Sequence, residues 1–109
     1  MCNYKVLHNN DHGYVVRCDS CGYLQVAFGT TCIALTVKQF GRFKNLIDDY
    51  HCMYRNEVCP SAKCVHIPTP IKAMTLLYTV TELTHLQEML EQAEACLEVE
   101  KLMTWDQNN

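Results

Sequence analysis

The chain has 109 residues, of which 49% are hydrophobic and 19% are charged, so it is long and apolar enough for one folded domain and is not a disordered chain. Its eight cysteines are about 7% of the residues, below the roughly 8–10% that is typical of a disulfide scaffold. No stretch approaches the ~20 apolar residues of a membrane span, and the first residues lack the basic and apolar regions of a secretion signal. We therefore expect a cytoplasmic protein, in which cysteines are free thiols or metal ligands.

The formal net charge of −3 is unevenly distributed. Residues 1–80 contain 8 basic and 5 acidic side chains, whereas residues 81–109 contain 1 basic and 7 acidic ones. The chain has no basic run with interleaved aromatic residues, which is the pattern that binds a phosphate backbone. The sequence therefore disfavours nucleic-acid binding.

Two hairpins are predicted within residues 1–35. Strands at residues 4–8 and 14–18 flank a run of turn-forming residues, 9–13. In the second hairpin, Gly29 stands where a type II′ turn needs glycine. Pairing outward from that turn places one apolar set on a single face of the sheet: Phe28 opposite Thr31, Val26 opposite Ile33, and Leu24 opposite Leu35. Cys32 then belongs to the other face, as a small side chain.

Two helices of similar design are predicted near residues 37–52 and 80–102. Each begins after a threonine that is followed three residues later by Gln39 or Glu82, which is the pattern of a capping box. Apolar residues then recur at spacings of three and four, and the two sets differ by 43 positions: Phe40, Phe43, Ile47, Tyr50 and Tyr54, and Leu83, Leu86, Leu90, Ala93 and Leu97. The strand residues before each helix align at the same offset, so we expect either one core shared by both helices or a duplicated strand–helix unit.

The expected fold is α+β, with an antiparallel sheet of about five strands and two helices mainly on one face. We expect a single domain, 1–109. Its segments are the hairpins (1–35), a helix (36–52), an irregular loop (53–63), strands (64–78) and a second helix (79–103). Near residues 64–67 a short strand is expected to lie at an edge or in a loop, because Pro68 and Pro70 follow it.

One local cysteine motif has a clear chemical meaning. Cys18 and Cys21 are separated by two residues and followed by Gly22, as in a zinc knuckle, in which two thiolates reach one tetrahedral Zn²⁺. If Tyr4 lies opposite Cys18, then Cys2 lies near this turn. We therefore predict a zinc site formed by Cys2, Cys18 and Cys21. A fourth ligand could come from Cys59, Cys64 or His66, and no spacing selects one of them.

Other roles of the cysteines have less support. A redox role for Cys18 and Cys21 is the alternative, although Cys21 leads into a strand and not into a helix N-terminus, which usually lowers the pKa of a reactive thiol. Cys96 is expected beside the core, and Cys52 has no assigned role. The chain contains no Gly-rich phosphate loop, His-Glu-x-x-His or Gly-x-Ser-x-Gly motif.

The order of these features is similar to a small uncharacterised bacterial family with no assigned function. The likeness rests on the N-terminal Cys, the run Gly-Tyr-Val-Val-Arg-Cys-Asp-Ser-Cys, the hairpin Ala27-Phe28-Gly29-Thr30-Thr31, Ile67-Pro68-Thr69-Pro70 and the Thr-x-x-Glu-Leu helix. It implies a small intracellular α+β protein and no activity. Relatives often have a histidine two positions after the first cysteine, where this chain has Tyr4.

Taken together, these features favour a non-enzymatic binding or adaptor module, stabilised by zinc at the knuckle. Its partner is expected to be another protein, or a second copy that associates through the helix at 80–102. A thiol-based redox enzyme or sensor that uses Cys18 and Cys21 is the alternative function.

Overall fold

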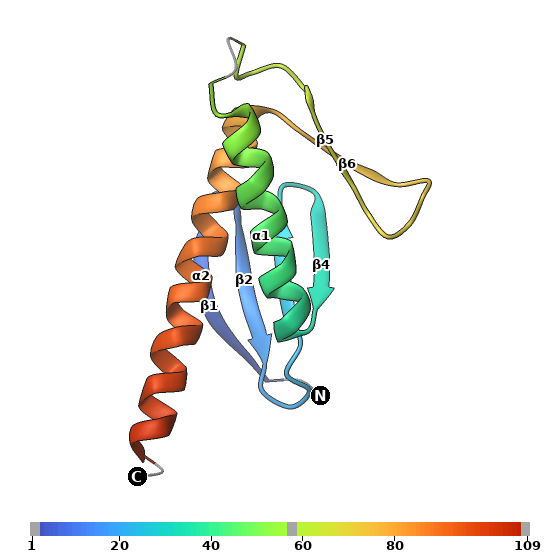
Figure 1. Ribbon diagram of the computed structural model, residues 1–109. Helices are drawn as coiled ribbons and strands as arrows, with labels where there is room; N and C mark the ends of the chain where they lie inside the picture. The colour runs from blue at the N-terminus through green and yellow to red at the C-terminus, as the bar shows by residue number, and fades with distance from the viewer. Residues whose placement is uncertain (1–2, 57–58, 108–109) are drawn as a thin grey trace.

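Four antiparallel strands in chain order form the main sheet of the computed structural model, which describes residues 3–56 and 59–107 (Figure 1). Two further strands form a separate hairpin, and two helices complete the fold. The elements are β1 (Tyr4–Asn10), β2 (Gly13–Cys18), β3 (Leu24–Phe28), β4 (Thr31–Leu35), α1 (Val37–Tyr54), β5 (Val65–Pro68), β6 (Thr75–Tyr78) and α2 (Val80–Gln107). The α+β class with two helices is therefore confirmed.

The β1–β2 hairpin has the predicted register, with Tyr4 opposite Cys18. Its turn is tighter than the expected loop at residues 9–13, because Asn10 and Gly13 already form a pair. The side-chain oxygen of Asn10 accepts hydrogen bonds from the backbone N–H groups of His12 and Gly13, which is how asparagine closes a short turn. A bulge between Val6 and His8 shifts the register along β1.

The β3–β4 hairpin confirms the predicted pairing of Phe28 with Thr31, Val26 with Ile33, and Leu24 with Leu35. Gly29 has a φ of +58°, and no non-glycine residue in the described part of the chain has a positive φ. A type II′ turn needs a positive φ at its first central residue only, whereas type I′ needs it at both. The turn type inferred from the sequence therefore agrees with the structure.

Both helices begin at the predicted capping boxes. The Thr36 side chain accepts a hydrogen bond from the Gln39 backbone and the Gln39 side chain accepts one from the Thr36 backbone; Thr79 and Glu82 repeat this arrangement. Both helices run past their predicted ends. Tyr54 continues α1 and its ring lies parallel to that of Tyr50, 6.4 Å away, and α2 contains no Gly or Pro that would end it.

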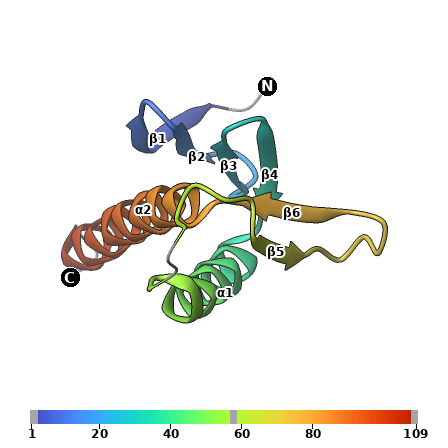
Figure 2. The same ribbon diagram turned by 90° about the horizontal axis from the view of Figure 1, so that it is seen from above.

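The helices cover one face of the main sheet, where α2 packs against β1 and β2 and α1 lies beside β4 (Figure 2). The predicted stripe of α2 is fully packed: Leu83, Leu86, Leu90, Ala93 and Leu97 are all buried. In α1, only Phe40 and Ile47 of the corresponding stripe are buried. The two helices are therefore not equivalent in the core, and their common origin by duplication stays a prediction. In the described residues, neither helix is apolar enough over sufficient length to span a membrane.

The β5–β6 hairpin corrects the expectation of one sheet with about five strands. The structure has six strands in its described residues, and β5 pairs with β6 alone. The hairpin projects away from the main sheet beside α1 (Figures 1 and 2). Val65 and Ile67 are buried in the shared core, while Pro68 has no N–H with which to extend a ladder. The hairpin is thus attached to the domain through side chains and not through sheet pairing.

Candidate functional site

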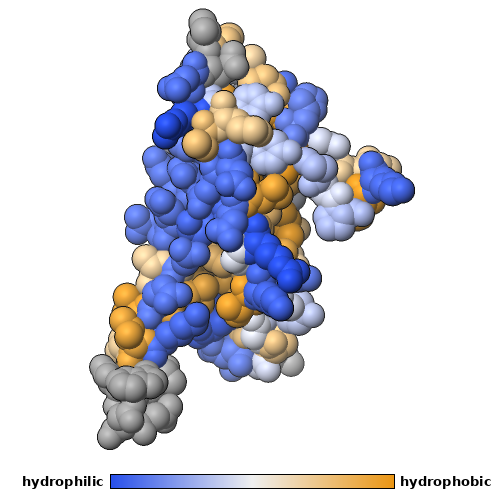
Figure 3. Space-filling view, viewed as in Figure 1, coloured by the Kyte–Doolittle hydropathy of each residue, from blue (hydrophilic) through white to orange (hydrophobic). Residues whose placement is uncertain are grey.

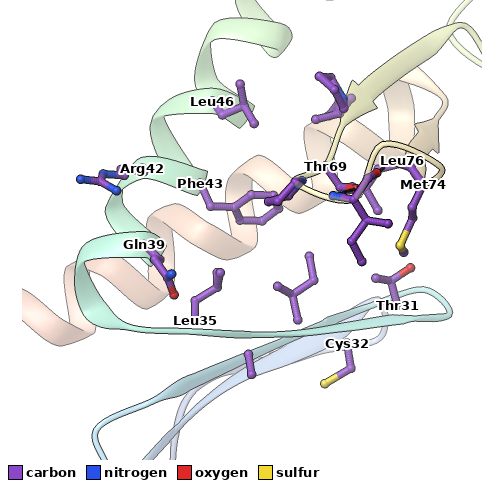
Figure 4. A pocket seen from close by; sticks show the side chains of 16 residues that line it. Thr31, Cys32, Leu35, Gln39, Arg42, Phe43, Leu46, Thr69, Met74 and Leu76 are labelled. Carbon is purple, nitrogen blue, oxygen red and sulfur yellow. Dashed lines mark hydrogen bonds between the residues drawn. The ribbon is translucent and has the colours of Figure 1, made fainter.

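A groove lies between the edge strand β4, the N-terminal half of α1 and the β5–β6 hairpin (Figure 4). Its volume is about 670 Å³, which falls within the range of small-molecule and peptide pockets. Most lining side chains are apolar, and Arg42 is the charged one among the described residues that form the wall. The principal apolar residues are Ile33, Leu35, Phe43, Leu46, Ile67, Ile71, Met74 and Leu76.

The groove exists because the core is open on the β4 side. Leu24 and Val26 of β3 are buried under the helices, whereas their partners Leu35 and Ile33 on β4 are only half-buried. Opposite them, Ile71 is 62% exposed on the hairpin. Contiguous exposed apolar surface of this kind is typical of a binding site. Figure 3 shows hydrophobic side chains in this region, between the helices and the projecting hairpin.

One wall of the groove is an open sheet edge. β4 is the last strand of the main sheet. The two-residue turn makes Phe28 and Thr31 a hydrogen-bonded pair, so the pairs along the hairpin alternate from that point. The backbone N–H and C=O groups of Cys32 and Ala34 therefore point away from β3, and both residues are exposed. A polypeptide could add to this edge.

Arg42 is the charged side chain of the described groove lining, and it is basic. Within the described part of the chain, the Arg42 side chain makes no hydrogen bond or ion pair. By contrast, Lys44 on the α2 side of the same helix is bound to Asp48. Figure 4 places Arg42 at the same end of the groove as Gln39 and Leu35, extending outward from α1. The rim therefore favours an anionic group.

The predicted knuckle has the expected backbone conformation. The N–H of Cys21 points to the sulfur of Cys18 at 3.4 Å, and Gly22 has a φ of +78°. The carbonyl of Asn3 accepts a hydrogen bond from the Asp19 N–H at 2.8 Å. Asn3 therefore lies beside the knuckle. Cys2 itself lies outside the described residues.

The three candidates for a fourth ligand lie at the other end of the molecule. Pro60, next to Cys59, accepts a hydrogen bond from Thr81 in the first turn of α2. Arg17, next to Cys18, binds Glu100 of the same helix, about 28 Å further along at 1.5 Å per residue. Cys64 and His66 are at or next to β5, on the hairpin side (Figure 1). In ranges 3–56 and 59–107, no three His, Cys, Asp or Glu side chains form a group that could hold a metal ion.

The other cysteines are free thiols. Cys96 is half-buried against the core, as expected. Cys32 and Cys52 are exposed, and Cys32 lies on the face of β4 that points away from α1 (Figure 4). Cysteine patterns in the sequence therefore did not locate the groove. Its walls come from three separate segments of ordinary apolar residues, a combination that no local motif indicates.

These features define a small α+β protein with helices on one face of an antiparallel sheet and an apolar groove at the sheet edge. The chain belongs to a family of unknown function, DUF6686, whose model matches residues 1–108. This agrees with the resemblance to a small family without assigned function. Comparison with curated proteins and with solved structures gave no match.

Proposed function

We propose that this protein is a non-enzymatic binding module that holds an apolar segment of a protein partner in the groove beside β4. The observation that carries the proposal is the exposed apolar wall formed by Leu46, Ile71 and Met74, which faces the half-buried residues of β4. A lining with a single charged side chain suits binding better than proton transfer, which needs paired titratable groups. Exposed thiols suit a reducing compartment, which supports the predicted cytoplasmic location.

Binding of the fluorescent probe anilinonaphthalene sulfonate tests the groove. The probe combines apolar rings with one anionic group, so it matches both the apolar wall and Arg42. We expect fluorescence enhancement with the native protein and at least about tenfold weaker binding to Leu46→Glu, because the introduced carboxylate would have to be desolvated. Leu77→Glu is the matched control, since Leu77 is also exposed but lies outside the groove. Equal binding by both variants would refute the proposal.

A second proposal is that zinc bound by Cys2, Cys18 and Cys21 stabilises the knuckle between β2 and β3. The N–H of Cys21 directed at the Cys18 sulfur supports it, because such a bond stabilises a thiolate ligand. Elemental analysis of protein purified without added metal should find about one zinc per chain. Cys21→Ser should lower this content, whereas Cys32→Ser, also at an exposed thiol, should not. Metal-free native protein would refute this proposal.

The redox alternative has less support from the site. The sulfur-bearing residue Cys18 is 1% exposed, so an oxidant has little access to it. Arg17 is bound to Asp19 and Glu100 and is not left to stabilise a thiolate. A disulfide between Cys18 and Cys21 after mild peroxide treatment would favour the redox function over zinc binding.

A further inference from the structure

We infer that the natural occupant of the groove is an extended peptide segment that adds to β4 as a fifth strand, inserts alternate apolar side chains into the groove and places an acidic side chain near Arg42. This inference rests on the proposed function and specifies its partner. Three observations carry it: the edge position of β4, the apolar groove that runs along the same strand, and Arg42 at one end, which has no side-chain partner among the described residues.

The edge favours a polypeptide in an extended conformation. The outward backbone groups of Cys32 and Ala34 offer two donors and two acceptors at fixed spacing, which a strand satisfies and an apolar small molecule does not. Natural edges are usually protected by inward charges, proline or a bulge. The described β4 residues Thr31–Leu35 contain no charged residue and no proline, so this edge is open to pairing.

The groove determines the side-chain pattern of the added strand. Successive side chains of a strand alternate between faces, so every second residue of the partner would point to the helix side, about 7 Å apart. Ile33 and Phe43 border that space on one side and Ile71 and Met74 border it on the other. Since β4 has five residues, the partner needs two or three apolar residues at alternate positions.

The rim determines the charge of the partner. Arg42 has no ion pair among the described residues. Asp48 of the same helix is bound on the side of α2 by Lys44 and Gln87. Because Arg42 lies at the Leu35 end of the groove (Figure 4), one acidic residue of the partner should lie next to that end of β4. An arginine with a free guanidinium binds a carboxylate in a two-pronged geometry.

A displayed library of random nine-residue peptides, selected against the full chain, provides the probe. The expected binders share apolar residues at alternate positions and an acidic residue at one end. A selected peptide is then synthesised in two forms, with N-methyl groups on one or the other set of alternate residues. Strand addition uses the N–H groups of one set only, so one form should bind at least about tenfold more weakly than the other.

Variants of the protein give a second, independent measurement. Ala34→Pro removes an outward N–H without removing a bond to β3 and should abolish peptide binding, while Ala34→Val keeps that N–H and should bind normally. Arg42→Glu should weaken binding of the acidic peptides and accept peptides in which lysine replaces the acidic residue. Equal affinity of the two N-methylated forms would overturn the inference, as would the absence of selected binders.

These outcomes are separable from those of the proposed function. If the dye still distinguishes Leu46→Glu from Leu77→Glu while both N-methylated peptides bind equally, the groove binds ligands but not by strand addition. If the dye does not distinguish these variants, the groove itself is not a binding site. The peptide inference would also be overturned if a fatty acid displaces the dye from the groove and no peptide is selected.

Discussion

Arg17 of β2 donates a hydrogen bond to the carboxylate of Glu100 in α2. Lys5 of β1 forms an ion pair with the same carboxylate, so the distal half of α2 is tied to two strands at once. Burial raises the pKa of Glu100, but the contacts with Lys5 and Arg17 outweigh it and hold the pKa below its ordinary value. The charged carboxylate therefore stabilises the folded state.

This arrangement predicts a pH-dependent stability. Because the folded-state pKa of Glu100 lies below the unfolded one, its contribution is present at neutral pH and is lost as the pH falls through the folded pKa. Glu100→Gln should lower the free energy of unfolding by about 1 kcal/mol at pH 7 and by much less near pH 3. Urea denaturation at the two pH values measures this. The exposed Glu98→Gln is the control, and an equal loss at both pH values would contradict the prediction.

Two glycines should respond to alanine in opposite ways. A Cβ atom on Gly13 would lie 1.9 Å from the Ala27 carbonyl oxygen, so Gly13→Ala should destabilise the sheet by about 2 kcal/mol or more. A Cβ on Gly41 in α1 meets nothing within 4 Å, and Gly41→Ala should stabilise the helix by about 0.5–1 kcal/mol. Thermal denaturation of both variants tests the pair. A stabilised Gly13→Ala variant would contradict the prediction, because β2 and β3 could then move apart without lowering the free energy of unfolding.

The capping box of α2 should contribute measurably to stability. The Thr79 hydroxyl accepts the Glu82 N–H at 2.9 Å, and Thr79 is buried. Thr79→Ala should cost about 1 kcal/mol, and Thr79→Ser, which keeps the hydroxyl, should recover most of that loss. Chemical denaturation gives both values. If serine is no better than alanine, the methyl group and not the cap accounts for the effect.

Self-association through the second helix stays a prediction, and it has a specific candidate surface. Val99, Leu102 and Met103 are exposed at helical spacing near the C-terminal end of α2. Burial of such a stripe against a second copy would make the molecular mass concentration-dependent. Light scattering up to about 100 μM should detect dimers in the native protein and fewer in Leu102→Glu, with Lys101→Gln, which changes the net charge by the same amount, as the control. A monomer at all concentrations would exclude this interface.

Strand registers and helix starts could be predicted because their determinants are local. Gly29 selects the turn, and two-residue alternation then determines every pair to Leu24 and Leu35. Thr36 and Thr79 identify helix starts by reciprocal hydrogen bonds within one turn. The predicted helix ends were less accurate. Helix α1 continues to Tyr54, whose ring stacks on that of Tyr50, and such a contact is not marked by a local stop signal.

The division of the strands into two sheets depends on contacts that are distant in sequence. Nothing near Val65 or Thr75 specifies whether the hairpin pairs with β4 or packs on the helices. The groove also depends on contacts that are distant in sequence, because its walls combine residues 31–35, 39–46 and 67–76. The sequence shows that Arg42 is basic, but that no other described side chain pairs with it follows from the tertiary fold.

The free thiols give the molecule its own chemical reporters. Cys21 is exposed at the knuckle, Cys32 at the open edge of β4, and Cys52 near the end of α1. Alkylation with iodoacetamide, followed by peptide mass spectrometry, would therefore report whether a ligand is bound at each of these places, in one sample of the native protein without substitutions. A bound metal should slow labelling of Cys21 and a docked strand should slow labelling of Cys32, while Cys52 supplies the internal rate standard.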